Sequence, residues 1–264
     1  MRHGSPRPEP DPAIVARLRA AGCVFAEDEA LLLSSEAAAT DARLEEWIAR
    51  RVEGEPLEQI LGWAGFRGLR LAVEPGVFVP RLRTEFLVSQ AEVLTRPGTV
   101  VVDLCCGNGA IGLALLAAQP SLRLYSTDLD PAAVRVAARN VGSAGTVLQG
   151  DLFAPLPAEL RGTVGVIVAN APYVPTEAIA EMPPEARLHE HRVALDGGSD
   201  GLELHRRIAA EAALWLASGG SVLIETSEGQ ADRTAGLLSA AGLEARIAHS
   251  DEVDGTVAIG TLAP

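Results

Sequence analysis

The residues best suited to chemistry in this chain begin with a glycine-rich turn. The apolar run Val100–Leu104 reads as a buried strand, and Gly107, Gly109 and Gly112 follow it with the spacing GxGxxG at the start of a helical stretch. Glycine permits a tight turn and lets a ligand approach without a Cβ atom in the way. By itself the motif indicates either a dinucleotide or S-adenosylmethionine.

Three acidic residues at the ends of successive predicted strands favour the second ligand. Asp103 lies on the first strand, where a carboxylate can help to hold a cationic amino-acid group but would oppose a pyrophosphate. Asp128 follows the next strand and suits ribose hydroxyls. Asp151 stands beside Leu152, which pairs an acid for the adenine amine with an apolar side chain for the ring. Each acid alone could merely cap a turn, but ligands collect at the carboxyl ends of parallel strands.

A second group of residues, Asn170-Ala-Pro-Tyr173, follows a fourth apolar run. Asn170 offers one acceptor and two donors, and with the Ala171 carbonyl it could bind both hydrogens of a planar NH₂ group. Tyr173 would pack against the plane, and Pro172 stiffens the segment. An amide nitrogen is a poor nucleophile, and this grip would aim it at a sulfonium methyl group without a strong base or a metal. The same residues are ordinary turn formers; behind a cofactor-type loop we interpret all four as catalytic.

The surrounding pattern predicts the elements that hold these residues. Short amphipathic helices are expected between residues 12 and 53, and glycine-punctuated apolar stretches between 54 and 80 predict a hairpin-like connector. From residue 99 onward apolar strands alternate with helices, which predicts an α/β fold with a mostly parallel sheet. The end of the chain, residues 243–262, reads as a closing antiparallel pair. We therefore expect a flexible tail (1–12), an N-terminal helical domain with its connector (13–75) and a catalytic domain (76–264).

With these motifs the chain resembles the peptide release factor glutamine methyltransferase family. Besides the glycine loop and Asn170–Tyr173, the resemblance rests on three further segments: Glu55-Pro-Leu-Glu-Gln-Ile-Leu-Gly62, Pro75-Gly-Val-Phe-Val-Pro-Arg81 and Ala194-Leu-Asp-Gly-Gly-Ser-Asp-Gly-Leu202. It implies a class I, Rossmann-like methyltransferase with a seven-stranded sheet, a reversed last strand, and an N-terminal helical domain that helps to recognise a protein substrate.

The resemblance, together with the chemistry of Asp103 and Asp151 described above, predicts positions for the ligands. The cofactor S-adenosylmethionine is expected at Asp103, Cys105, Cys106, Gly107, Asn108, Gly109, Asp128, Leu129, Asp151, Leu152 and Asn170, and the substrate, a glutamine of a peptide chain release factor, at Asn170 through Tyr173. Two departures stand out. Ala171 replaces a proline of the usual Asn-Pro-Pro-Tyr, and Leu82-Arg83 replaces Pro-Glu in the usual Arg-Pro-Glu-Thr-Glu.

The amino-acid composition bears on the kind of substrate, on membrane association and on metal binding. The formal net charge is −13, and no dense basic run is present, so a nucleic-acid substrate is disfavoured. No apolar run approaches the length of a membrane span, and the three cysteines match neither a zinc nor a redox spacing, which indicates a cytoplasmic protein without a metal. The competing hypotheses are a methyltransferase for the amino group of a nucleic-acid base, a nicotinamide-dependent oxidoreductase, and a non-catalytic binding module.

Overall fold

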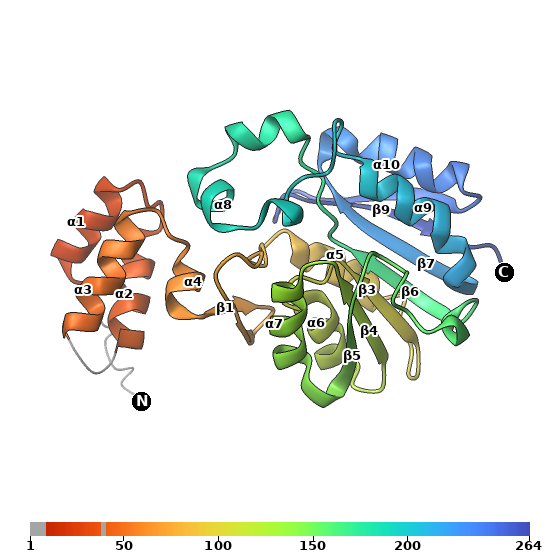
Figure 1. Ribbon diagram of the computed structural model, residues 1–264, viewed down its shortest axis with the longest axis horizontal. Helices are drawn as coiled ribbons and strands as arrows, with labels where there is room; N and C mark the ends of the chain where they lie inside the picture. The colour runs from red at the N-terminus through yellow and green to blue at the C-terminus, as the bar shows by residue number, and fades with distance from the viewer. Residues whose placement is uncertain (1–8, 38–40) are drawn as a thin grey trace, which may run out of the picture.

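The computed structural model describes residues 9–37 and 41–264, and its N-terminal part is a small helical bundle at one end of the molecule (Figure 1). The bundle consists of α1 (Pro12–Ala20), α2 (Ala26–Ala37) and α3 (Asp41–Val52). Asp11 caps α1 by accepting a 2.8 Å hydrogen bond from the backbone N–H of Ala13. Residues 1–8 of the predicted tail lie outside the described residues.

Apolar side chains at helical spacing hold this bundle together. Leu18, Leu33 and Ile48, one from each helix, are fully buried in its core. A fourth helix, α4 (Leu57–Leu61), adds Ile60 to the same core. This short helix lies within the segment for which the sequence predicted only a connector. It ends at Gly62, whose φ of 75° is left-handed.

The predicted hairpin follows directly. Strands β1 (Trp63–Phe66) and β2 (Leu69–Ala72) pair in antiparallel register. The two residues between them, Arg67 and Gly68, both have positive φ values, 47° and 77°, as a tight two-residue hairpin turn requires. Helix α5 (Thr84–Glu92) then leads into the large sheet.

The large sheet has seven strands in the order β5-β4-β3-β6-β7-β9-β8. Its strands are β3 (Val100–Leu104), β4 (Arg123–Asp128), β5 (Gly145–Gln149), β6 (Val164–Ala169), β7 (Leu216–Thr226), β8 (Glu244–Ser250) and β9 (Gly255–Thr261). The pairs from β5 to β7 are parallel, whereas the last strand, β9, runs antiparallel to both of its neighbours. The predicted fold class is confirmed.

Helices cover both faces of this sheet (Figure 1). With α5, the helices α6 (Ala110–Ala118) and α7 (Pro131–Val141) cover one face, and α9 (Glu203–Trp215) and α10 (Glu228–Ala240) cover the other. Alternate side chains of each central strand enter two separate cores, which explains the continuous apolar runs. The remaining pieces are α8 (Pro184–His189) and the 3₁₀ turns η1 (Gly142–Ala144), η2 (Ala158–Leu160), η3 (Thr176–Glu181) and η4 (Arg192–Ala194). No helix within residues 9–37 and 41–264 is long and apolar enough to cross a membrane.

Candidate active site

A cavity of about 670 Å³ lies at the carboxyl ends of the central parallel strands. Its volume is in the usual range for a site that binds a small molecule or cofactor. Most of the residues predicted for the site line it: Cys105, Cys106, Gly107, Asn108, Asp128, Leu129, Asp151, Leu152, Asn170, Ala171, Pro172 and Tyr173. Asp103 and Gly109 do not line it. The parallel strands β3, β4 and β6 end at the same edge of the sheet. Both predicted groups of residues, the glycine-rich loop and Asn170–Tyr173, therefore line one cavity.

The glycine-rich loop is shaped by its backbone. Gly107 has a φ of 56°, and a Cβ atom built there would meet nothing within 4 Å, so this position leaves open space toward a ligand. Its N–H donates a 2.8 Å hydrogen bond to Oδ2 of Asp128. Gly109 serves packing instead, because a Cβ there would lie 3.2 Å from Val141 Cγ2 on α7. Gly109 thus contributes to the helix arrangement and not to the cavity wall.

Asp128 joins the loop to the end of β4. Its Oδ1 accepts a 2.9 Å hydrogen bond from the N–H of Asp130, and its Oδ2 accepts the bond from Gly107. Burial raises the pKa of the carboxyl group, and the hydrogen bonds from the backbone oppose that rise. An ionised carboxylate has about four acceptor sites. Asp128 can therefore hold the loop and still accept hydrogen bonds from a vicinal diol.

Asp103 lies on β3, the strand predicted for it, but its side chain does not line the cavity. The side chain is completely buried, and its Oδ2 accepts a 3.0 Å hydrogen bond from the N–H of Gly112 in α6. The physical reason is the alternation of side chains along β3, which turns Asp103 toward the helix. Desolvation raises its pKa to about 7. Asp103 braces the first turn of α6 behind the loop.

The loop after β5 lines another part of the cavity. Leu152 is buried with a φ of 48°, and the neighbouring Phe153 stacks on Trp215. Asp151 is half-exposed and forms a 2.7 Å ion pair with Arg207 of α9. An acid beside a buried apolar side chain is the arrangement that the sequence predicted for a purine ring.

Asn170 directly follows β6, and its amide is held from the side of α5. Its Nδ2 donates to the Thr84 hydroxyl over 3.3 Å. Ala171 is fully buried, and Tyr173 is partly buried. Burial raises the pKa of the Tyr173 hydroxyl, and the neighbouring Glu225 adds to that rise. The hydroxyl therefore stays protonated at neutral pH.

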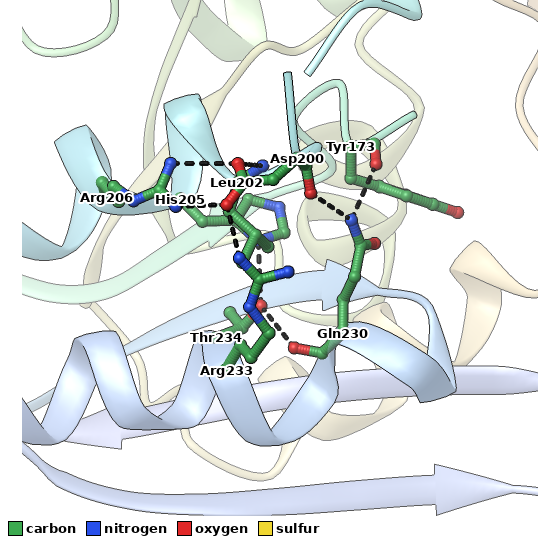
Figure 2. A network of polar contacts seen from close by, with 8 residues as sticks. All are labelled: Tyr173, Asp200, Leu202, His205, Arg206, Gln230, Arg233 and Thr234. Atoms are coloured by element: carbon green, nitrogen blue, oxygen red, sulfur yellow. Dashed lines mark hydrogen bonds and ion pairs between the residues drawn. The ribbon is translucent and has the colours of Figure 1, made fainter. Parts of the chain in front are cut away.

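Residues 196–202 form a backbone buttress behind Asn170–Tyr173. A Cβ atom at Gly197 would approach the Pro172 carbonyl oxygen to 2.8 Å, so the two segments touch through their backbones. The N–H of Gly197 donates a 2.8 Å hydrogen bond to the Val174 carbonyl. Figure 2 shows Gln230 of α10 joining both segments, with Nε2 donating to the carbonyls of Tyr173 (3.1 Å) and Asp200 (3.2 Å).

The comparisons with known proteins agree with this geometry. A family model described as the methyltransferase small domain matches residues 69–199. A release factor glutamine methyltransferase of Cereibacter sphaeroides is 37% identical over an alignment of 265 positions, gaps included, that covers 92% of this chain and 93% of the relative. The chain belongs to the release factor glutamine methyltransferase family.

Two further similarities show the breadth of this group. A 4-amino-L-phenylalanine/4-methylamino-L-phenylalanine methyltransferase of Streptomyces pristinaespiralis is 38% identical over an alignment of 204 positions, gaps included, that covers 74% of this chain and 69% of the relative. Among solved structures, a methyltransferase from Pyrococcus furiosus aligns with a TM-score of 0.57 at 16% identity, covering 82% of this chain and 98% of that one. That second likeness shows the fold alone.

In this member of the release factor glutamine methyltransferase family, the structure also places residues at the site that the sequence analysis did not select. Thr84 and Gln230 contact the segment Asn170–Tyr173 directly, and Glu225 lies beside them at the end of β7. The position of Thr84 inside the segment Arg81–Glu85 was an available signal. No local pattern singles out Gln230, because its role depends on where α10 crosses the buttress.

Proposed function

We propose that this chain transfers a methyl group from S-adenosylmethionine to the side-chain amide nitrogen of a glutamine in a peptide chain release factor. The observation that carries the proposal is that Asn170–Tyr173 and the glycine loop line one cavity. Membership of the release factor glutamine methyltransferase family supports the choice of substrate.

The residues of the cavity fit the cofactor. Gly107 leaves space beside its backbone, Asp128 has acceptor capacity for the ribose hydroxyls, and Asp151 with Leu152 suits the adenine. Cys105, Cys106, Asn108 and Leu129 complete the same wall. When bound, S-adenosylmethionine supplies an electrophilic methyl group on a positively charged sulfur.

The chain's own contribution is to orient the nucleophile. Oδ1 of Asn170 and the carbonyl of Ala171 accept one amide hydrogen each, so that the nitrogen lone pair turns toward the methyl group. Tyr173 limits the movement of the amide plane. A methyl group transferred to this nitrogen would replace one of its hydrogens, which would leave as a proton to water, so the product amide would be neutral. Two acceptors aimed at these hydrogens also stabilise the positive charge that develops on nitrogen.

A labelling experiment tests this proposal. Purified enzyme is incubated with methyl-labelled S-adenosylmethionine and a release factor, and the labelled peptide is located by mass spectrometry. We expect label on one glutamine and none on a release factor in which that glutamine is replaced by glutamate. Label only on nucleic acid would refute the proposal. Absence of label on every substrate would also refute it and would favour a non-catalytic module that binds the cofactor.

The Asn170→Ala variant gives the matching test on the enzyme. We expect cofactor binding, measured by calorimetry, to stay within a few-fold of wild type, while methyl transfer falls by roughly 10²–10³-fold, the usual effect of removing a group that stabilises developing charge. A rate equal to that of wild type would remove Asn170 from the mechanism.

The Streptomyces relative motivates one second candidate, the arylamine of a free amino acid, which is also a planar NH₂ group with a delocalised lone pair. Offering 4-amino-L-phenylalanine beside the release factor in the same assay separates the two. Preference for the free amino acid, measured as kcat/KM, would overturn the release factor as substrate.

A further inference from the structure

The side-chain amide of Asn170 can sit in two orientations that exchange its oxygen and its nitrogen. Only one of them presents the oxygen to a substrate NH₂ group, because an NH₂ group of the enzyme cannot accept a hydrogen bond. In the structure Nδ2 points to Thr84 and leaves Oδ1 for the cavity, with 3.3 Å between Nδ2 and Thr84 Oγ1. Something must favour this orientation over its reverse.

Thr84 alone does not decide it. The hydroxyl is both a donor and an acceptor, so it could equally donate to Oδ1 of a reversed Asn170. The side chain is only 2% exposed at the first residue of α5, so water has little access to it. The direction of the hydrogen bond therefore depends on where the hydroxyl proton goes.

Glu225 provides the destination for that proton. The residue is 1% exposed, and neither carboxylate oxygen has a hydrogen bond of ordinary length and angle in the described part of the chain. Burial raises its pKa, and the groups that oppose this rise are the Thr84 hydroxyl and the guanidinium groups of Arg83 and Arg81. A buried ionised carboxylate only accepts hydrogen bonds, and it draws the proton of any neighbouring hydroxyl.

We propose that Thr84 and Glu225 are positioning residues that fix the amide of Asn170 with its oxygen toward the substrate. Thr84 donates its proton to the Glu225 carboxylate, so its oxygen can only accept, and the sole matching group of Asn170 is Nδ2. This inference rests on the proposed function, since it assigns Oδ1 of Asn170 to the methyl-accepting NH₂ group.

The same carboxylate also serves the other end of the catalytic segment. Arg83 Nε lies 3.4 Å from Oε1 of Glu225, and the Arg83 guanidinium is close enough to Tyr173 to oppose the rise in the pKa of its hydroxyl. Glu225 thus acts on Asn170 through Thr84 and on Tyr173 through Arg83. Arg83, which departs from the family pattern, here supplies a positive charge that opposes the rise in the pKa of the buried Glu225 carboxyl group.

The test compares Thr84→Val, which has nearly the same shape but no hydroxyl, with Thr84→Ser, which keeps it. With the substrate that the wild-type enzyme methylates, we expect Thr84→Val to lower kcat roughly ten- to hundred-fold, the scale of a misplaced reacting group. Its Kd for S-adenosylmethionine should stay within about two-fold of wild type. Thr84→Ser should recover most of the rate. Thr95→Val, a buried threonine near the other end of α5, is the matched control and should be fully active.

Glu225→Gln tests the second half of the pair. A glutamine at position 225 can donate a hydrogen bond to Thr84 Oγ1. The Thr84 hydroxyl proton is then free to point toward Asn170, so kcat should fall by a similar factor. Both substitutions break the same chain of hydrogen bonds from Glu225 through Thr84 to Asn170. Adding Thr84→Val to Glu225→Gln should therefore lower kcat little further than either change alone. Equal kcat for Thr84→Val and wild type, or fully additive losses in the double variant, would overturn the positioning role. A wild-type enzyme that methylates no glutamine would instead refute the proposed function.

Discussion

The carboxyl group of Asp103 is enclosed between β3 and α6, and its burial has a consequence for stability. Desolvation raises its pKa from an ordinary 3.8 to about 7. Between these two values the unfolded chain is ionised while the folded chain keeps its proton, so unfolding releases a proton. The contribution of this residue to the free energy of unfolding therefore falls as pH rises from about 4 to about 7.

Asp103→Asn removes this titration while keeping an oxygen for the N–H of Gly112. We expect the difference in unfolding free energy, variant minus wild type, to become more positive between pH 5 and pH 8, by a few kcal/mol at most (about 1.4 per pKa unit). Urea unfolding of both proteins at the two pH values measures it. Because only Asp103 differs, other titrating groups cancel; a difference that does not change with pH would show that Asp103 is ionised in the folded state.

Asp103 also shows which features of the site the sequence could not predict. The sequence predicted the strand that carries Asp103, and the glycine loop and Asn170–Tyr173 were recognised from short patterns. The direction of the Asp103 side chain depends on which face α6 covers, and the support from Thr84, Glu225 and Gln230 depends on contacts between segments far apart in the chain. Local patterns carry no information on such contacts.

The buttress 196–202 is the element whose geometry is most restrictive. Gly201 has a φ of 74°, and a Cβ atom there would lie 2.3 Å from the Tyr173 carbonyl oxygen and 2.4 Å from Gln230 Nε2. Gly201→Ala should therefore displace Asn170–Tyr173 and lower kcat at least ten-fold, since small misplacements of reacting groups are costly. Steady-state kinetics with the release factor measures the loss.

Gly236→Ala is the matched control for that substitution. Gly236 lies within α10, and a Cβ atom there would meet nothing within 4 Å. Alanine is the better helix former by about 1 kcal/mol, so this variant should be as stable as wild type or more so, and fully active. Equal activity of Gly201→Ala and Gly236→Ala would show that the buttress does not position the catalytic segment.

Element boundaries were predictable where a single pattern dominates, and less so where two compete. The strand β3 occupies the predicted residues Val100–Leu104. In contrast, β7 begins at Leu216, directly after α9 ends, because pairing of Leu216 with Val164 extends the strand. The helix α4 was missed since its five residues are too few to show a period, and packing of Ile60 on the bundle stabilises it.

In the whole molecule, the N-terminal bundle has its own core and meets the catalytic part at few polar contacts. Gln59 Nε2 donates a 3.0 Å hydrogen bond to the His189 carbonyl, and Arg51 lies 3.4 Å from Glu185 of α8. Arg51 is itself held by Glu29 of α2, at 2.7 Å. The bundle is thus placed beside the segment that leads to the cavity without lining the cavity itself. Such a module suits recognition of a large substrate at a distance from the reacting nitrogen.

Exposed side chains on the bundle allow a test of whether it recognises the protein substrate. Val24 and Phe25, in the turn before α2, are 81% and 68% exposed. Adjacent exposed apolar side chains are good candidates for a protein interface. We expect Phe25→Ser to raise KM for the intact release factor several-fold, because an aromatic contact that the complex would bury is lost. We expect kcat to stay unchanged, because no group at the cavity is altered.

Leu214→Ser on α9, which removes a comparably exposed side chain (57%) from the opposite part of the molecule, controls for a general loss of surface apolar area. A short peptide that contains the glutamine should be methylated equally by all three proteins. If Phe25→Ser slows the peptide as much as the intact factor, the bundle supports the fold of the enzyme and does not recognise its substrate.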